Sequence, residues 1–284
     1  MKTIKYVSIL FFFLMAFGSS KIYAQFTLSI GLTVRDAPPP LPVYDQPVCP
    51  EEGYLWTPGY WAFGDDGYYW VPGVWVLPAQ TGFLWTPGYW EFRGGYYDFH
   101  PGYWGPHIGY YGGVNYGYGY GGSGYYGGRW EGDHFRYNTA VVNVDRTYIH
   151  NTYEDRTVIV DRQVNRTSFN GPGGIRTSPT HEEEQAMRES HVAPTAEQTS
   201  HFQGASKDRS QFASVNKGRP ATTAVNRVGG QSTYHMESHN QASQPARQET
   251  HMQQAQPAHS APSQQSSHQS HGSSSSRPAG HNKH

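Results

Sequence analysis

The sequence has little of what protein chemistry most often uses. Of its 284 residues only one is cysteine and 15% are charged, and the formal net charge is −1. A single cysteine cannot form an internal disulfide, and it excludes cysteine-based zinc clusters. The balanced charge, with a pI of about 6.9, gives no basic surface that would attract nucleic acid. Neither a Gly-x-Ser-x-Gly nor a His-Glu-x-x-His motif occurs, so these hydrolase and metalloprotease signatures are absent.

Long apolar runs are also lacking, except at the N-terminus. There Lys2 and Lys5 precede a short apolar segment, Ile9–Phe17, and Ala24 provides a small residue before Gln25. The segment is too short to span ~30 Å of hydrocarbon comfortably, so it predicts a signal peptide over residues 1–24 rather than a membrane anchor. No later segment is apolar enough to cross a bilayer. We therefore expect an exported chain, periplasmic, on the outer surface or extracellular, with no transmembrane span in the mature protein.

The sequence is rich in tryptophan and tyrosine, whereas charged residues and long aliphatic runs are few. Four aromatic units end in Trp61, Trp75, Trp90 and Trp104, which are spaced by 14, 15 and 14 residues. Each unit carries Trp-x-Pro-Gly-x-Trp, except that Phe99 stands in the fourth unit where the others have their first tryptophan. Such regular copying predicts one small structural unit repeated in tandem.

The Pro-Gly pairs leave two ways of folding each unit. Pro-Gly favours a type II turn, whereas two-residue hairpins prefer the primed turns. Either Pro-Gly closes a hairpin and Trp56 faces Trp61, or Pro-Gly forms a bend and the true hairpins lie at Asp66-Gly67 and Gly94-Gly95. Both outcomes predict an antiparallel meander in which large aromatic side chains replace an aliphatic core. The fold class is therefore mainly β: an aromatic-rich antiparallel repeat meander with a small β/α region and long disordered segments.

The composition divides the rest of the chain. Residues 25–50 contain a leading strand and a Pro-rich linker, and the strand is predicted because apolar and polar residues alternate over residues 26–34. Residues 51–105 are the four-unit repeat module. Residues 106–128 are a glycine–tyrosine tract, too glycine-rich for a packed core of its own, which either drapes over the sheet or forms a sticky, partly ordered segment.

Two further segments follow. In residues 129–228, a small β part has expected strands at Val141–Val144 and Thr157–Val160, and a helical part has expected N-caps at Thr180, Thr195 and Asp208. Residues 229–284 are rich in Gln, Ser and His, with almost no large apolar side chains, and are expected to be disordered.

These repeat units resemble the YXWGXW (WXXGXW) repeat family of exported bacterial proteins. Blocks outside the repeats are also similar to a subgroup, among them Ser29–Arg35, Ser168–Ile175, His191–Gln198 and Phe212–Pro220, so the likeness extends over residues 26–222. The resemblance implies export and architecture, and no reaction. The departure at Phe99 and His100 predicts an edge or capping repeat.

The repeat tryptophans are also the candidate ligand-binding residues. As core, the rings pack on one another, because a short sheet needs large side chains for burial. As a surface, rings on the outer face of alternating strands would stack on sugars or on a partner. The candidates are Trp56, Trp61, Trp70, Trp75, Trp85, Trp90 and Trp104.

The remaining motifs and acidic residues have ordinary structural explanations. Gly119–Gly124 matches Gly-x-Gly-x-x-Gly, but a glycine-rich tract produces that match by chance. Asp65 and Asp66 lie in an expected turn, where aspartate serves the backbone. Beside them, the acids nearest the repeats are Glu51, Glu52, Glu91 and Asp98, with no pattern typical of a glycosidase.

Histidines are the remaining candidates for chemistry. His100 and His107 flank Trp104 and form one small candidate site. The tail histidines are irregularly spaced, unlike the ligands of structural metal sites, so they predict at most weak binding of transition metals. The tail histidines are His235, His239, His251, His259, His268, His271, His281 and His284.

The sequence therefore predicts a non-enzymatic exported protein with no catalytic residue, metal site or cofactor. Its expected role is structural or interactive, in the cell envelope or extracellular matrix, through aromatic repeat-mediated association with itself or with envelope and matrix components. One alternative is a carbohydrate-binding module that uses exposed tryptophans, with polysaccharide as the partner. A second alternative is weak transition-metal binding by the histidine-rich tail.

Overall fold

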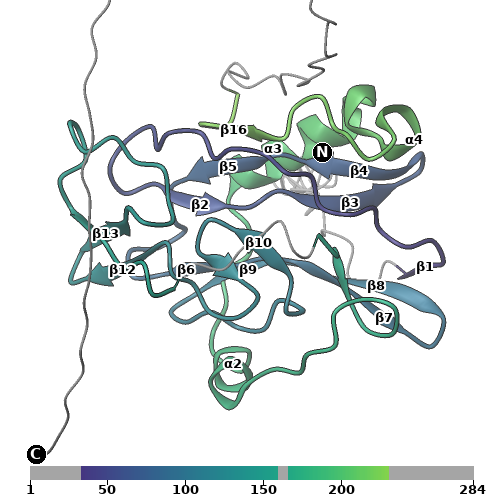
Figure 1. Cartoon of the computed structure of the whole chain (residues 1–284), viewed down its shortest axis with the longest axis horizontal. Coiled ribbons are helices and arrows are strands. Elements are labelled where there is room, and N and C mark those ends of the chain that lie inside the picture. Colours follow the sequence, from purple (N-terminus) through teal and green to yellow (C-terminus); the bar gives the residue numbers. More distant parts are fainter. Residues whose placement is uncertain (1–32, 159–165, 230–284) are drawn as a thin grey trace, which may run out of the picture. The chain divides into compact units, whose positions relative to one another are not determined.

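Two bent hairpins of the same design form the core of the chain. The computed structural model describes residues 33–158 and 166–229 (Figure 1). The first hairpin runs through β2 (Leu55–Thr57), β3 (Tyr60–Gly64), β4 (Gly67–Val71) and β5 (Gly73–Val76). The second runs through β6 (Leu84–Thr86), β7 (Tyr89–Arg93), β8 (Tyr96–His100) and β9 (Tyr103–Gly105). Each hairpin contains two of the four sequence units, so two units make one structural copy.

The strand register pairs the tryptophans of neighbouring units. In the first hairpin Trp56 stands opposite Trp75, and Trp61 stands opposite Trp70. Their rings meet edge to face with centroids 5.4 and 5.3 Å apart, an arrangement that aromatic quadrupoles favour. Trp56 therefore does not face Trp61, and the alternative in which Pro-Gly closes a hairpin is wrong.

Pro-Gly instead bends both arms of each hairpin at the same level. A side chain at Gly59 would overlap the Trp70 ring and the backbone of Gly73, and one at Gly73 would lie 2.5 Å from the Trp56 ring. Glycine is required here because two backbones and two indoles meet at one point. The bend of one arm is thus packed against the bend of the other.

The chain reverses where the turn residues predict it. Gly94 and Gly95 connect β7 to β8 with φ of 63° and 89°, the positive values of a primed two-residue turn. In the first hairpin Asp65 and Asp66 form the two-residue connection, one residue before the expected pair, and Gly67 follows with φ of 97°.

The second hairpin repeats the design with one substitution. Trp85 stands opposite Trp104, and Trp90 stands opposite Phe99. Phe99 therefore takes the place of a tryptophan within the ring pairing. It does not mark an edge, because β8 lies between β7 and β1 (Thr33–Val34) in a four-stranded sheet. The edge alternative at Phe99 is wrong for that reason, and the capping alternative stays a prediction.

Short strands from distant parts of the chain extend the hairpins. β1 pairs with β8, which confirms the last two residues of the expected leading strand; residues 26–32 lie outside the described residues. β15 (Phe169–Asn170) pairs in parallel with β7, and β16 (Ala224–Val225) pairs in parallel with β5. The two hairpins contact each other where Trp90 Nε1 donates a hydrogen bond to the Trp61 carbonyl at 2.8 Å.

The glycine–tyrosine tract drapes over the hairpins, as one of the two alternatives predicts. It contains β10 (Asn115–Gly117) and β11 (Tyr120–Gly121), and its tyrosines join the core of the repeats. Tyr116 Oη donates to the Gly88 carbonyl at 2.6 Å, and Tyr120 Oη donates to the Trp85 carbonyl at 2.8 Å. Tyrosine hydroxyls thus satisfy backbone carbonyls of the second hairpin near its Pro-Gly bend.

Replacing Tyr120 by phenylalanine is expected to lower the free energy of unfolding by about 1–2 kcal/mol, because a buried carbonyl loses its donor. The matched control is Tyr148→Phe, since Tyr148 is 79% exposed. Urea unfolding of the two variants measures the difference. Equal midpoints for both variants and the wild type would show that the tract is not held by its hydroxyls.

The region behind the tract differs from expectation in its strands. A three-stranded sheet consists of β12 (Gly128–Glu131), β13 (His134–Asn138) and β14 (Thr152–Tyr153). The strand predicted at Val141–Val144 is wrong. The Val141 and Val142 amides both donate to the Asn138 carbonyl, so this segment forms a turn, and the Val142 side chain is buried although it belongs to a turn. Thr157 also lies in a turn, and residues 159–160 of the second expected strand lie outside the described residues.

The helical part begins where the caps predict. α2 (His181–Ala186) and α3 (Ala196–Lys207) both start with complete capping boxes, at Thr180 and Thr195. Asp208 caps the 3₁₀ helix η1 (Arg209–Gln211), and α4 (Ala213–Asn216) follows. Within the described part of the chain, no helix is long and apolar enough to cross a membrane.

Helix α3 packs on the first hairpin. Phe202 and Phe212 lie against Tyr69 of β4, with ring centroids 5.8 and 5.4 Å apart. Ala62, Val71 and Ala205 complete this small cluster. A short helix with few apolar residues is therefore stabilised by tertiary packing rather than by its own propensity. Of the predicted tail, residues 229–284, all but residue 229 lie outside the described residues.

Candidate functional site

The predicted ligand-binding tryptophans are all core residues. Relative exposure is between 0 and 2% for six of the seven, and the most exposed, Trp85, reaches 7%. Five indole nitrogens donate hydrogen bonds, four of them to buried partners; Trp104 Nε1, for example, donates to Gln198 Oε1 at 2.7 Å. Trp85 lines a cavity of only about 40 Å³, well below the roughly 300 Å³ at which small-molecule sites begin. Ligand binding by these rings stays a prediction, and their burial does not favour it.

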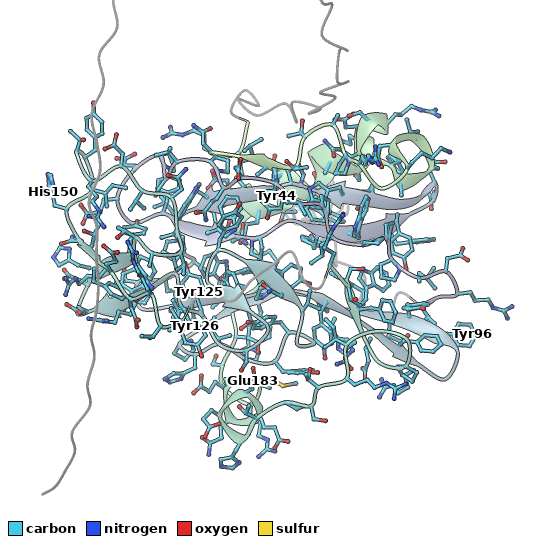
Figure 2. The ribbon with its side chains drawn as sticks, viewed as in Figure 1. Tyr44, Tyr96, Tyr125, Tyr126, His150 and Glu183 are labelled. Atoms are coloured by element: carbon cyan, nitrogen blue, oxygen red, sulfur yellow. The ribbon has the colours of Figure 1, made fainter. Side chains whose placement is uncertain are left out.

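Other aromatic rings cover the tryptophans from outside. The Tyr44 ring contacts the Trp56 and Trp70 rings, at centroid distances of 6.4 and 6.3 Å, and the Tyr118 ring lies 5.7 Å from Tyr44. Tyr96, in contrast, lies at the tip of the β7–β8 hairpin and is 38% exposed (Figure 2). The exposed aromatic surface is therefore made of tyrosine at the margins, while tryptophan forms the centre.

The sheet that carries the eighth tryptophan has on its other face a polar surface that sequence reasoning missed. Trp130 of β12 is half-buried and packs on Phe135, with centroids 5.3 Å apart. On the opposite face of this sheet, Glu131 accepts hydrogen bonds from both Arg129 and Arg136, which lowers the pKa of the carboxyl. The Arg129 guanidinium lies 4.3 Å from the centre of the Tyr153 ring.

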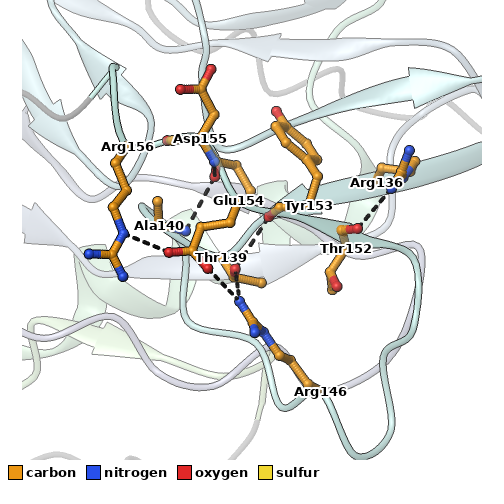
Figure 3. A network of polar contacts seen from close by, with 10 residues as sticks. Arg136, Thr139, Ala140, Arg146, Thr152, Tyr153, Glu154, Asp155 and Arg156 are labelled. Atoms are coloured by element: carbon orange, nitrogen blue, oxygen red, sulfur yellow. Dashed lines mark hydrogen bonds and ion pairs between the residues drawn. The ribbon is translucent and has the colours of Figure 1, made fainter.

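A second carboxylate extends this surface. Glu154 pairs with Arg146 and Arg156 beside Thr139 and Asp155, as Figure 3 shows. All these groups are at least partly exposed, and exposed ion pairs contribute little to stability. Both carboxylates thus have their charge paired with arginine.

The acids near the repeats have structural partners. Asp65 and Asp66 are exposed in the first hairpin turn, as predicted. Glu91 and Asp98 stand opposite each other in β7 and β8, but Glu91 Oε2 lies 2.9 Å from His100 Nε2, and Asp98 Oδ1 accepts a hydrogen bond from Thr33. Repulsion between the two carboxylates is thus relieved by different neighbours.

The two histidines beside Trp104 do not come together. His100 stacks on Tyr89, with ring centroids 4.5 Å apart, while His107 Nδ1 lies 2.8 Å from Glu189 Oε1. Among residues 33–158 and 166–229, no group of three or more His, Cys, Asp and Glu side chains could hold a metal ion. The tail histidines lie outside the described residues.

The single cysteine is buried next to the first hairpin. Cys49 is 5% exposed and its thiol donates to the Glu51 carbonyl at 3.2 Å. Burial raises the pKa of the Cys49 thiol from 9.0 to about 12. The unfolded chain therefore ionises first, so this group's stabilising effect is complete below pH 9 and is lost as the pH rises towards 12.

Cys49 is expected to resist alkylation in the native protein. A pKa of about 12 leaves roughly one thiolate in ten thousand at pH 8, because the charged form is poorly solvated. Iodoacetamide at pH 8 should leave the native mass unchanged and add one adduct in guanidinium chloride. Rapid native labelling would show that the thiol is accessible.

A groove lies where α3 and η1 meet the segment around β16. Its volume is about 400 Å³, within the range of ligand sites. His201 lines it and lies 2.8 Å through Nε2 from the Pro72 carbonyl, so Nε2 carries the proton and Nδ1 is left as an acceptor. Burial lowers the pKa of His201, which keeps the ring neutral. Gln211, which is 2% exposed, lines the groove together with Ser200, Asp208 and Thr222.

Comparison with known proteins assigns the hairpins to a repeat family. The family model of the WXXGXW repeat matches the chain in two copies, at residues 53–76 and 81–104. Each copy coincides with one bent hairpin, which confirms the resemblance seen in the sequence. Neither the curated proteins nor the solved structures include a significant match to the chain.

Proposed function

From the two buried copies of the WXXGXW repeat, we propose that the chain is a non-enzymatic exported protein with a structural or interaction role in the cell envelope or extracellular matrix. The observation that carries this proposal is the burial of all seven repeat tryptophans in paired rings. Side chains used in this way form a rigid frame, on which tyrosine-rich and charged segments are displayed.

Export is supported by the N-terminal pattern, although those residues lie outside the described part of the chain. Lys2 and Lys5, the apolar segment and Ala24 are typical of a cleaved signal peptide. Fractionation of expressing cells, with mass spectrometry of the product, tests this part. A product that begins at Gln25 outside the cytoplasm is expected; an uncleaved chain in the cytoplasm would contradict it.

Association with other copies or with matrix components is supported by the low net charge and by exposed tyrosines at the margins of the fold. The whole sequence has a net charge of −1, and removal of Lys2, Lys5 and Lys21 with the signal peptide leaves −4 (−1 − 3), which provides little repulsion between copies. Tyr96, Tyr126 and Tyr148 are exposed. Sedimentation velocity over a range of concentrations should show larger species that decrease in the triple variant with Tyr96→Ser, Tyr126→Ser and Tyr148→Ser. A strictly monomeric chain that also captures no matrix component would contradict the proposal.

The carbohydrate-binding alternative makes a different optical prediction. Under our proposal, tryptophan emission is blue-shifted and does not change with soluble envelope or matrix polysaccharides, since the indoles are buried. A saturable change for one glycan would favour the alternative. Trp130→Phe removes the half-buried tryptophan, so any change that survives in this variant comes from the repeats.

Metal binding by the tail remains the second alternative. Neutral imidazole is a ligand for zinc, copper and nickel, and eight histidines lie beyond residue 229. Zinc titration of the chain with those eight histidines replaced by asparagine is the test. An affinity equal to that of the wild type would exclude the tail as the metal ligand.

A further inference from the structure

The groove beside α3 contains a buried amide with no partner. Gln211 is 2% exposed, and its Oε1 has no hydrogen-bond partner within the described residues. Buried polar groups are nearly always hydrogen-bonded, because desolvation without a partner is unfavourable. Gln211 lines the groove, but its Oε1 is itself covered, so the side chain must turn towards the groove before a ligand can meet this group.

The other buried side-chain amides of the described chain all bind backbone. Asn138 accepts from the Asp155 amide at 2.9 Å and donates to the Asp155 carbonyl at 3.0 Å, so it holds both backbone groups of one residue. Gln46 Oε1 accepts from the Asn143 amide at 2.7 Å, although Gln46 Nε2 has no partner within the described residues, and Gln198 accepts from the Thr195 amide at 2.9 Å. Among these four buried amides, only Gln211 lacks a backbone partner.

A glycine in α3 keeps the same groove open. Gly204 lies inside the helix, where glycine is unfavourable relative to alanine. A Cβ at this position would have no atom within 4 Å, so packing does not require glycine. A larger side chain there would project into the groove, and glycine leaves the helix backbone accessible to a ligand.

We propose that this groove binds an extended peptide segment of a partner protein, with the Gln211 amide holding the N–H and the C=O of one residue. In an extended chain these two groups point to the same side, as they do in a hydrogen-bonded strand pair. Pro72, Val225 and Val228 form an apolar wall for a side chain of the peptide. Asp208 is the acidic side chain at the groove, so the segment carries no acidic residue there.

The volume of the groove sets the length of the segment. About 400 Å³ accommodates a few residues, and the His201 ring forms part of the groove lining. Proteins that bind an extended peptide by strand addition use the same combination: backbone hydrogen bonds give the affinity and a side-chain pocket gives the specificity. This inference goes beyond the proposed scaffold role, because it gives the chain a specific docking site for another protein.

The test uses residues 25–284, labelled with ¹⁵N, and a capped peptide, acetyl-Ser-Val-Ala-Val-Ser-amide. We expect saturable shifts of the Gln211 side-chain amide and of the Gly204 backbone amide at millimolar peptide. The matched ligand carries N-methyl groups on both valines and on the alanine, which removes the N–H groups. Its affinity should be lower by about tenfold or more, because a buried hydrogen bond is lost.

Two variants complete the test. Gln211→Leu should lower the peptide affinity by about tenfold while the thermal midpoint stays the same or rises, because the amide it removes has no partner. Gly204→Leu should block binding by filling the groove, and it does not alter Gln211. If Gln211→Leu fails to fold, Gly204→Leu carries the test.

Several outcomes would overturn the inference. One is that the Gln211 and Gly204 amide signals do not shift at millimolar peptide. This includes the case in which another part of the chain already occupies the groove and protects the Gln211 amide protons from exchange. Another is equal binding of the N-methylated peptide, which would reveal apolar contact alone. Undiminished binding by Gly204→Leu would place the site elsewhere. None of these outcomes bears on export or self-association, which are tested separately.

Discussion

Replacing Gly73 by alanine is expected to destabilise the protein by about 3 kcal/mol, because the new methyl group has no space. Its Cβ would lie 2.5 Å from Trp56 Cζ2 and 3.0 Å from the Gly59 amide nitrogen. The φ of Gly73 is not among the positive values, so the loss is steric rather than conformational. Chemical denaturation followed by circular dichroism measures it.

The control and the rescue for this variant are both available in the chain. Gly204→Ala makes the same chemical change where the Cβ has no neighbour within 4 Å, and it should stabilise α3 by about 1 kcal/mol. Trp56→Phe removes the ring atoms that Gly73→Ala would strike, so the double variant should be more stable than the sum of the single losses predicts. Strict additivity, or a stable Gly73→Ala, would contradict the interlocked bends.

Trp104→Ala is expected to lower the free energy of unfolding by about 4 kcal/mol. Trp104 is 0% exposed, pairs with Trp85, and donates from Nε1 to Gln198 Oε1 at 2.7 Å. The substitution leaves a cavity in the second hairpin and removes a donor from a buried amide at the start of α3.

The comparison for this prediction is Trp130→Ala. Trp130 is half-buried on the β12–β13 hairpin and donates to the Phe83 carbonyl at 3.0 Å. Its removal should cost about half as much, since less apolar area leaves the core. Equal losses in guanidinium unfolding would mean that the repeat tryptophans are not the centre of the fold.

Local signals in the sequence predicted the elements that depend on neighbouring residues. The caps at Thr180 and Thr195, the turn at Gly94-Gly95 and the unit spacing all follow from a few adjacent positions. Residues 141–144 show the limit of such reasoning: β-branched residues predicted a strand, but Val142 is buried from a turn because Asn138 binds the amides that a ladder would use.

Contacts between distant residues could not be predicted in the same way. The Tyr116 hydroxyl binds the Gly88 carbonyl across 28 residues, and nothing near either position in sequence indicates it. The charged strands β12 and β13 were missed because Arg129 and Arg136 occupy a solvent-facing side, where β propensity is weak. The groove depends on the burial of Gln211, which arises only when η1 packs beside the first hairpin.

Pairing between motifs has a consequence for how such a chain can grow or shrink. The four Trp-x-Pro-Gly-x-Trp-like motifs form two hairpins, and each family match of 24 residues, 53–76 or 81–104, contains a complete pair. A duplication or deletion of one motif would leave an indole without its opposite ring and a Pro-Gly bend without its counterpart. A change of length by two motifs keeps every indole and every bend paired, whereas an odd number of motifs leaves one half-pair that only another copy of the chain could complete.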